Sequence, residues 1–283
     1  MKFTKYEAAG NTYLIVNDEG FPLSPKSAIK CCHPVFGVGS DGIICWKSGA
    51  DEVNSVHVSI YNPDGTVAEK SGNGLRILAT YLFENIFSNA QSLKLFTLGG
   101  CVSATSIPTN LEGKSCQKGN QILLEMGHVV CQINGKSLDH SPNFPNGLRL
   151  QTEAGEMIGF PVSIGNPHFV SFVDPPTAEY AQKWGPLIEN HFQFPNRTNV
   201  QFAKVINRKR IQAEIWERGA GYTLSSGSSS CAIAAVAYQL GLCNSEVTVS
   251  MPGGLLKVRL GSDGMAWLTG PVNKTVEGVF NLN

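Results

Sequence analysis

Short stretches in which apolar and polar residues alternate run along most of this chain. Such alternation has the period of a β-strand that buries one of its faces. Gly, Pro and Asn residues bound the stretches, as they do at turns. The pattern predicts a sheet-rich fold of the α+β class with mostly antiparallel strands. The clearest predicted strands are residues 56–61, 122–126, 247–251, 255–260 and 265–270.

Two apolar stretches are longer and do not show this alternation: LRILATYLF (75–83) and CAIAAVAYQLG (231–241). Each follows a Ser-Gly pair, at 71–72 and at 226–227, and small polar residues are typical of helix starts. One helix of about a dozen residues is therefore predicted in each half of the chain, packed inside a curled sheet.

The two halves repeat one another at a nearly constant offset. Asn11 precedes an apolar run, and Asn166 precedes a similar run 155 residues later. The strand-like segment 58–62 returns at 213–217, again after 155 residues, and the Ser-Gly pairs keep the same spacing. This self-similarity indicates two copies of one unit, so we predict two pseudo-symmetric domains that face each other. The predicted domains are residues 1–118 with 272–283, and residues 119–271.

Composition excludes several classes of partner. The chain has 22 Lys and Arg against 22 Asp and Glu, so no basic excess would attract nucleic acid or anionic lipid. No apolar run reaches the roughly 18 residues that cross a bilayer, and the N-terminus does not resemble a signal peptide. The eight cysteines form no CxxC pair, which favours free thiols in a reducing compartment. We therefore expect a cytoplasmic protein that acts on a small molecule, with neither nucleic acid nor membrane as partner.

The duplicated Ser-Gly segments are candidate ligand sites. Each places small residues at a helix N-terminus, where free backbone N–H groups and the positive end of the helix dipole favour a carboxylate or phosphate. The simpler interpretation is that Ser71 and Ser226 only cap their helices. Duplication at constant offset favours the ligand site. The segments are Ser71-Gly72-Asn73-Gly74 and Ser226-Gly227-Ser228-Ser229.

A matched pair of groups beside a bound carboxylate suits the inversion of an α-carbon. That reaction needs a base on one face and an acid on the other, and the groups exchange roles in the reverse direction. A thiol fits this task because its pKa, near 8.5, can be tuned toward neutrality. A serine hydroxyl is too weak an acid unless a strong base activates it. The chain thus has the layout of a two-base site with unsuitable atoms in it.

Other motifs carry less weight. Residues 37–42 match GxGxxG, but a strand-like IICW follows them, so the context of a dinucleotide site is missing. No Walker A sequence and no Cys/His pattern for zinc is present. His168 is a lone histidine beside a predicted strand, and such residues are often structural.

Several segments together resemble the diaminopimelate epimerase family, over nearly the whole chain. The resemblance implies two pseudo-symmetric domains, each a barrel-like sheet around a central helix, with no pyridoxal phosphate, metal or nucleotide cofactor. The resemblance is compatible with a homodimer but does not determine the oligomeric state. The matching segments are FTKYEAAGNTYLIVND (3–18), HPVFGVGSDG (33–42), YNPDG (61–65), SGNGLR (71–76), GNPH (165–168), NRTNV (196–200), WERGAG (216–221), MPGG (251–254) and LTGP (268–271).

The same resemblance implies roles for individual residues. Ser71 and Ser226 occupy the positions of the two catalytic cysteines, and His168 and Glu217 would lie near this acid/base pair. Backbone N–H groups around Gly72-Asn73-Gly74 and Gly227-Ser228 would hold the carboxylate at the reacting carbon. The polar groups of the substrate would meet Asn11, Asn62, Asn166, Asn199, Glu217 and Arg218.

The departures from the family pattern are as informative. The same one-atom change at both cysteine positions, in an otherwise intact site, favours deliberate replacement and an inactive form; natural loss of the thiols is the alternative. Thr12 stands where the family usually has Asp, and Tyr222 where it usually has Glu. Residues 228–230 are Ser-Ser-Ser in place of a Thr/Ser-Gly-Ala sequence. These changes bear on the choice of substrate.

Three functions are compatible with the sequence. Arg218 favours a substrate with a second carboxylate, such as LL-diaminopimelate, in lysine and peptidoglycan precursor synthesis. Tyr222 favours an aromatic or imidazole side chain, as in a histidine racemase. If the serines are native, the chain is a binding protein, or a lyase or isomerase that uses other acid–base groups.

Overall fold

The computed structural model describes residues 1–18, 23–49, 53–107, 121–133, 136–137 and 147–282. The chain divides into two compact units, which we call unit 1 (Met1–Glu125 with Thr269–Asn283) and unit 2 (Met126–Leu268). The divisions fall within β8 (Gln121–His128) and β19 (Met265–Gly270). The predicted boundary at 118/119 lies outside the described residues, and the predicted boundary at 271/272 follows β19 directly.

The sheet of unit 1 is built in the order β20-β1-β2-β3-β4-β6-β7-β8, with the short β5 also paired to β4. The β2–β3 and β4–β6 pairs are parallel and the other pairs are antiparallel. The strands are β1 (Lys2–Ala8), β2 (Asn11–Asn17), β3 (Ile43–Ser48), β4 (Ser55–Tyr61), β5 (Val67–Ala68), β6 (Ser92–Thr97), β7 (Gly100–Ile107) and β20 (Asn273–Val279).

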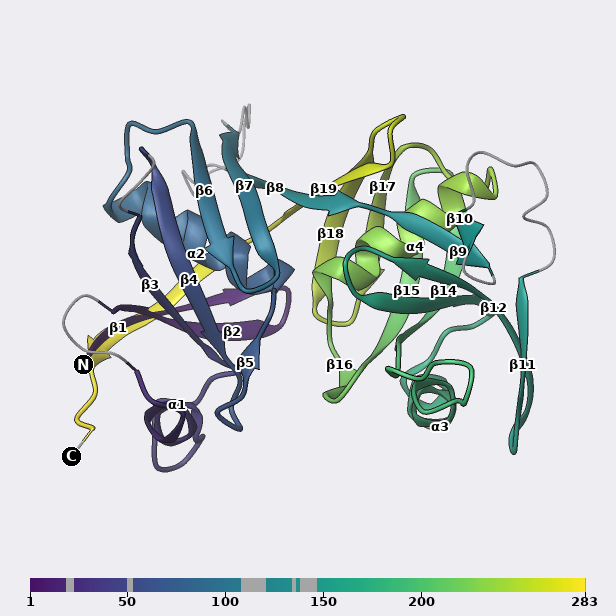
Figure 1. Cartoon of the computed structure of the whole chain (residues 1–283), viewed down its shortest axis with the longest axis horizontal. Coiled ribbons are helices and arrows are strands. Elements are labelled where there is room, and N and C mark those ends of the chain that lie inside the picture. Colours follow the sequence, from purple (N-terminus) through teal and green to yellow (C-terminus); the bar gives the residue numbers. More distant parts are fainter. Residues whose placement is uncertain (19–22, 50–52, 108–120, 134–135, 138–146, 283) are drawn as a thin grey trace. The chain divides into compact units, whose positions relative to one another are not determined.

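Helix α2 (Gly72–Asn85) runs through the middle of unit 1 and contacts β1, β2 and β7 (Figure 1). It is buried on almost every side, the polar Asn73, Arg76 and Thr80 included, and most of its other residues are apolar. Helix α1 (Pro25–Cys32) covers the opposite face of β2 and β3. Because side chains alternate along a strand, Leu14 and Val16 face α1, whereas Tyr13 faces α2.

Unit 2 repeats this arrangement. Its central order is β12-β13-β14-β15-β17-β18, with parallel pairing of β13 to β14 and of β15 to β17. The short β16 pairs with β15, as β5 pairs with β4 in unit 1. The strands are β9 (Val130–Ile133), β10 (Lys136–Ser137), β11 (Leu148–Thr152), β12 (Gly155–Ser163), β13 (Pro167–Phe172), β14 (Asn199–Asn207), β15 (Arg210–Glu217), β16 (Gly221–Thr223), β17 (Glu246–Met251) and β18 (Gly254–Leu260).

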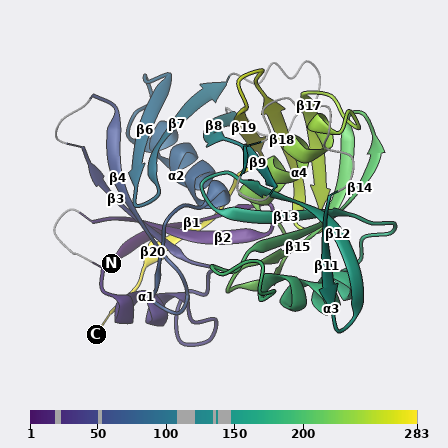
Figure 2. The same cartoon turned by 45° about the vertical axis from the view of Figure 1, so that its right-hand side comes forward.

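Helix α4 (Gly227–Gln239) is the central helix of unit 2 and contacts β12, β13, β14, β17 and β18 (Figure 2). Helix α3 (Ala178–Glu189) lies on the other face, where its Trp184 and Ile188 pack with Phe169 and Phe202. The duplicated α+β fold predicted from the sequence is confirmed, and most of the described strand pairs are antiparallel.

The prediction of one helix in each half is wrong, because each unit has two helices among its described residues. Helix α1 has only eight residues, too short for a clear apolar period. Helix α3 contains Gly185-Pro186, a dipeptide that normally indicates a break in a helix. Ser24 and Thr177 cap the two helices through their side chains and are the local signals that mark their starts.

Two further properties concern only the described residues. All seven cysteines among them are free thiols, and Cys116 lies outside this part of the chain. None of the described helices combines the length and the apolar character needed to cross a membrane.

Candidate functional site

Ser71 caps helix α2 of unit 1. Its backbone is extended, and its Oγ accepts a hydrogen bond from the Gly74 N–H at 3.1 Å. The side chain of Asn73 donates to Oδ1 of Asn11, at the start of β2, at 2.6 Å. The fold therefore brings Asn11 to the helix N-terminus that the sequence singled out, 60 residues away in the chain.

Tyr13 belongs to the same cluster, although nothing in the sequence singled it out. Its phenol oxygen lies 3.1 Å from Ser71 Oγ. The ring leaves no room for a side chain at residue 42, because a Cβ on Gly42 would come within 2.6 Å of Tyr13 Cε1. We call Asn11, Tyr13, Ser71, Asn73 and Gly74 the unit 1 cluster.

The other predicted residues of unit 1 bond elsewhere. The backbone N–H and the hydroxyl of Thr12 donate to Asp41 Oδ2 at 2.7 and 3.0 Å. The Asn62 side chain donates to the Thr66 hydroxyl at 3.0 Å, within a turn. These bonds explain the local backbone, and the substrate contacts suggested for Thr12 and Asn62 stay predictions.

Ser226 caps helix α4 of unit 2 in the same way as Ser71 caps α2. Its backbone is extended, its Oγ lies 3.4 Å from the Ser229 N–H donor, and it is only 5% exposed. Its hydroxyl also lies beside the carboxyl group of Glu217 and acts to lower the pKa of that group. Desolvation by the surrounding protein raises the pKa of Glu217, and the nearby Ser226 hydroxyl only partly opposes this effect.

His168 is buried at the start of β13, between two amide side chains. Nδ1 accepts from Gln201 Nε2 at 2.9 Å, so Nε2 carries the proton and donates to Asn166 Oδ1 at 3.0 Å. The same Gln201 amide donates to Ser229 Oγ at 3.0 Å, in the first turn of α4. Burial, assisted by the charge of Arg218, lowers the pKa of His168 to about 3. His168 is therefore a neutral side chain, held in one tautomer.

This environment predicts a dependence of stability on pH. Unfolded His168 binds a proton below its ordinary pKa of 6.5, whereas folded His168 does so only near pH 3. The free energy of unfolding should therefore fall as pH is lowered from 6.5 toward 3, by at most about 1.4 kcal/mol per pH unit for this group. His168→Gln is expected to flatten the dependence, measured by urea unfolding between pH 4 and pH 7.

The exposed His57 supplies the control for this measurement. His57→Gln should leave the slope of unfolding free energy against pH unchanged. An unaltered slope in His168→Gln would show that another group causes the acid sensitivity.

Asn199 joins two of the predicted segments of unit 2. Its Nδ2 donates to the Pro167 carbonyl at 2.8 Å, next to His168, and its Oδ1 accepts the Arg218 N–H at 3.0 Å. The Arg218 guanidinium donates to the Asn196 carbonyl at 3.1 Å. The GNPH, NRTNV and WERGAG segments therefore meet around one asparagine side chain.

Glu189, at the end of α3, was not predicted from the sequence. Its carboxylate is almost fully buried and accepts three hydrogen bonds: from Trp216 Nε1 at 2.7 Å, the Gly219 N–H at 2.9 Å and Arg197 Nη1 at 3.0 Å. Trp216 directly precedes Glu217 in the chain, and Gly219 directly follows Arg218. Glu189 thus fixes the turn on which two predicted site residues stand.

Tyr222 lies on a different face from Glu217. It pairs across the β15–β16 ladder with Trp216, so both rings lie on the side of α3. Its hydroxyl donates to Glu214 Oε2 at 2.7 Å, and burial together with this bond raises the pKa of Tyr222 to about 12. This placement gives Tyr222 a partner within the protein, and its role in specificity stays a prediction.

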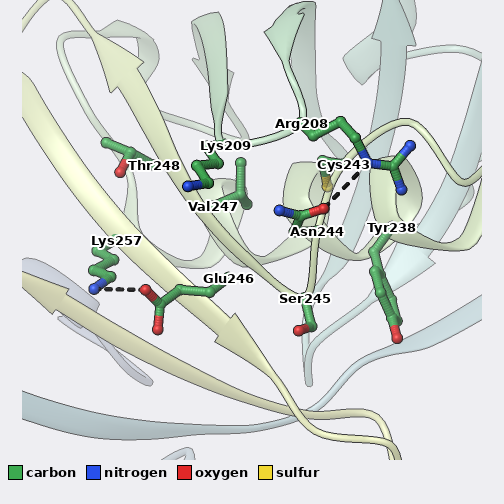
Figure 3. A pocket seen from close by; sticks show the side chains of 10 residues that line it. All are labelled: Arg208, Lys209, Tyr238, Cys243, Asn244, Ser245, Glu246, Val247, Thr248 and Lys257. Atoms are coloured by element: carbon green, nitrogen blue, oxygen red, sulfur yellow. Dashed lines mark hydrogen bonds and ion pairs between the residues drawn. The ribbon is translucent and has the colours of Figure 1, made fainter.

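A separate hollow of about 670 Å³ opens in unit 2 beside the β14–β15 turn (Figure 3). Its polar contacts are internal, for example Lys257 with Glu246 and Arg208 with Asn244. None of the predicted site residues lines it. The lining residues are Arg208, Lys209, Tyr238, Cys243, Asn244, Ser245, Glu246, Val247, Thr248 and Lys257.

Each unit thus presents a helix N-terminus with a capping hydroxyl and a second titratable group beside it. Such an N-terminus can hold a carboxylate through its N–H groups. The phenol of Tyr13 lies beside Ser71, and the carboxyl group of Glu217 lies beside Ser226. Among the described residues, no three His, Cys, Asp or Glu side chains are grouped so that they could hold a metal ion.

Comparisons with solved structures agree with this duplicated architecture. A hydroxyproline epimerase from Agrobacterium vitis matches with a TM-score of 0.70 at 15% identity, over 98% of this chain and 91% of its own. A putative phenazine biosynthesis protein from Clostridium difficile matches with a TM-score of 0.64 at 11% identity, over the full length of both chains. At such low identity these likenesses establish the fold alone.

Comparisons of sequence are more specific. The profile of the family described as diaminopimelate epimerase matches residues 3–133 and 160–275. Diaminopimelate epimerase 2 from a Nostoc species is 41% identical over 98% of this chain and 95% of its own length. Diaminopimelate epimerase from Moorella thermoacetica is 33% identical over the full length of both. The chain therefore belongs to the diaminopimelate epimerase family.

Proposed function

We propose that this protein is a cofactor-independent isomerase of the diaminopimelate epimerase type, whose ligand is LL-diaminopimelate. The observation that carries the proposal is the matched pair of helix N-caps, Ser71 and Ser226, at equivalent places in the two units. Inversion of an α-carbon needs one proton acceptor and one proton donor, and each unit supplies one such position.

The choice of diaminopimelate depends on Arg218. A guanidinium group pairs with a carboxylate through two parallel N–H donors, so it favours a substrate that carries a second carboxylate. The Arg218 backbone N–H donates a hydrogen bond to the Asn199 side chain, which holds the backbone of Arg218 in place. Histidine and lysine share the reacting end of diaminopimelate but lack the distal carboxylate.

As the chain stands, we expect it to bind this ligand without turning it over. Serine at both positions gives neither N-cap a side chain that ionises readily near neutral pH. The second candidate function is thiol-less acid–base chemistry on the same scaffold. The contact of Ser71 with Tyr13 and the Glu217 carboxyl group beside Ser226 favour it, because each serine lies next to a stronger acid.

Calorimetric titration with LL-diaminopimelate, L-lysine and L-histidine tests the proposal. Diaminopimelate should bind at least about tenfold more tightly than the other two amino acids, since it gains a charge-assisted contact with Arg218. Arg218→Ala should weaken diaminopimelate binding by roughly ten- to a hundredfold and lysine binding much less.

Arg149→Ala is the matched control, because Arg149 pairs with Glu156 on the surface of the same unit. Equal losses for diaminopimelate and lysine in Arg218→Ala would refute the assigned contact. If histidine bound more tightly than diaminopimelate, histidine would replace diaminopimelate as the proposed substrate. Deuterium uptake by any of the three amino acids with the serine form in D2O would favour the thiol-less function.

A further inference from the structure

Tyr13 is the residue of the unit 1 cluster that no sequence motif pointed to. It lies on β2, two residues after Asn11, on the strand face that meets α2. Its phenol oxygen is 3.1 Å from Ser71 Oγ, the atom that takes the place of a reacting group in the proposed function. A buried tyrosine hydroxyl usually finds some partner, but here the partner is the N-cap of the ligand-binding helix.

The position of this hydroxyl is tightly constrained. Tyr13 is only 8% exposed, and its ring packs so closely on Gly42 that even a Cβ at residue 42 would collide with it. Strand β2 is held on both sides, by β1 and by β3. The phenol therefore cannot swing away without disturbing the centre of the sheet.

Hydrogen-bond roles at Ser71 Oγ depend on the charge at that position. The Gly74 N–H can only donate to it, whereas the Tyr13 hydroxyl can donate or accept. A negatively charged atom at position 71 can only accept, so both neighbours would then donate to it. The N-terminus of α2 adds its positive dipole end. All three effects favour the ionised form of an acid at this position.

We propose that Tyr13 is a positioning residue that stabilises the ionised form of the acid/base group at position 71. This inference rests on the proposed function, which makes position 71 one of the two proton-transfer positions. It also gives the two positions different characters. Position 226 lies beside the carboxyl group of Glu217, which cannot donate a hydrogen bond once it is ionised.

The test uses the full chain with Ser71→Cys and Ser226→Cys, with and without Tyr13→Phe. The phenylalanine keeps the ring that packs on Gly42 and removes only the hydroxyl. The pH dependence of iodoacetamide alkylation, read by mass spectrometry on the peptide that contains position 71, reports ionisation of that thiol. Tyr13→Phe should lower the alkylation rate near pH 7 about tenfold and move the titration to higher pH.

Two controls separate this role from general loosening of the structure. The thiol at position 226, followed in the same digest, should titrate unchanged. Tyr61→Phe should leave position 71 unchanged, because the Tyr61 hydroxyl bonds to the Leu23 carbonyl in the same unit. The proposal would be overturned if the pH dependence of alkylation at position 71 stayed the same in Tyr13→Phe. An equal shift of this pH dependence in Tyr61→Phe would overturn it as well.

The alkylation readout does not require turnover, so it distinguishes this inference from the proposed function. A Tyr13-dependent titration in a protein that never exchanges an α-proton would uphold the hydrogen bond and reject the isomerase. If the protein exchanges the α-proton but the thiol at position 71 titrates independently of Tyr13, the isomerase is upheld and the role of Tyr13 is rejected. If the double cysteine variant fails to fold, Ser71→Cys alone supports the same alkylation measurement.

Discussion

Ser71→Cys combined with Ser226→Cys is expected to raise the rate of α-proton exchange on LL-diaminopimelate at least about a thousandfold. One positioned acid–base group typically contributes a factor of roughly 10² to 10⁴, and the serine form lacks two. A thiol has a pKa near 8.5, whereas a serine hydroxyl is far weaker as an acid. Both substitutions are small, and both positions keep the extended backbone of an N-cap.

The measurement is loss of the α-proton signal of the substrate in D2O, followed by proton NMR. Each single variant should stay close to the serine form, because proton removal and proton delivery need both groups and such effects are not additive. Exchange by the unmodified chain at the rate of the double variant would show that the thiols are not the acid–base groups. A double variant that never exchanges would lead to the same conclusion.

Glu189→Ala is expected to lower the free energy of unfolding by about 3 kcal/mol. The substitution leaves Trp216 Nε1 and the Gly219 N–H without their acceptor, and each lost partner costs on the order of 1–3 kcal/mol. The Arg197 contact adds little, because that side chain is 52% exposed and its charge is screened. The lost bonds hold the turn that carries Glu217 and Arg218, so diaminopimelate binding should weaken as well.

Urea unfolding at neutral pH measures this loss, and Glu156→Ala is the control. Glu156 also bonds to an arginine, but both side chains are well exposed, and its removal should cost less than about 1 kcal/mol. Glu189→Gln keeps an acceptor oxygen, so its loss of unfolding free energy should lie between those of Glu189→Ala and Glu156→Ala. Equal stabilities of Glu189→Ala and Glu156→Ala would show that the buried carboxylate does not hold the turn.

The duplicated plan of the fold was predictable from the sequence because a repeat is a relation between distant residues that needs no structure to detect. The 155-residue offset that joins Asn11 to Asn166 also joins the N-caps of α2 and α4. The starts of these two helices were equally clear, since a small polar residue directly before a long apolar run is typical of an N-cap.

Partners that act across the sheet were not predictable. Tyr13 stands in an apolar run and has the pattern of a core residue; its contact with Ser71 depends on which helix covers that face of β2. Gln201 and Glu189 lie in segments with no local signal, and their roles arise from strand pairing and from the position of α3. The same reasoning applies to Tyr222, whose side of the ladder follows from its register with Trp216.

The burial of α2 and α4 inside their own sheets has a consequence for folding. Both helices are mostly apolar and buried, so neither can persist in water once its strands have left it. The helix N-termini that the proposed function assigns to the substrate carboxylate therefore form only when the whole surrounding unit is assembled. Amide hydrogens in the middle of both helices should exchange with solvent only through global opening of their unit, so ligand affinity depends on the cooperative folding of each unit.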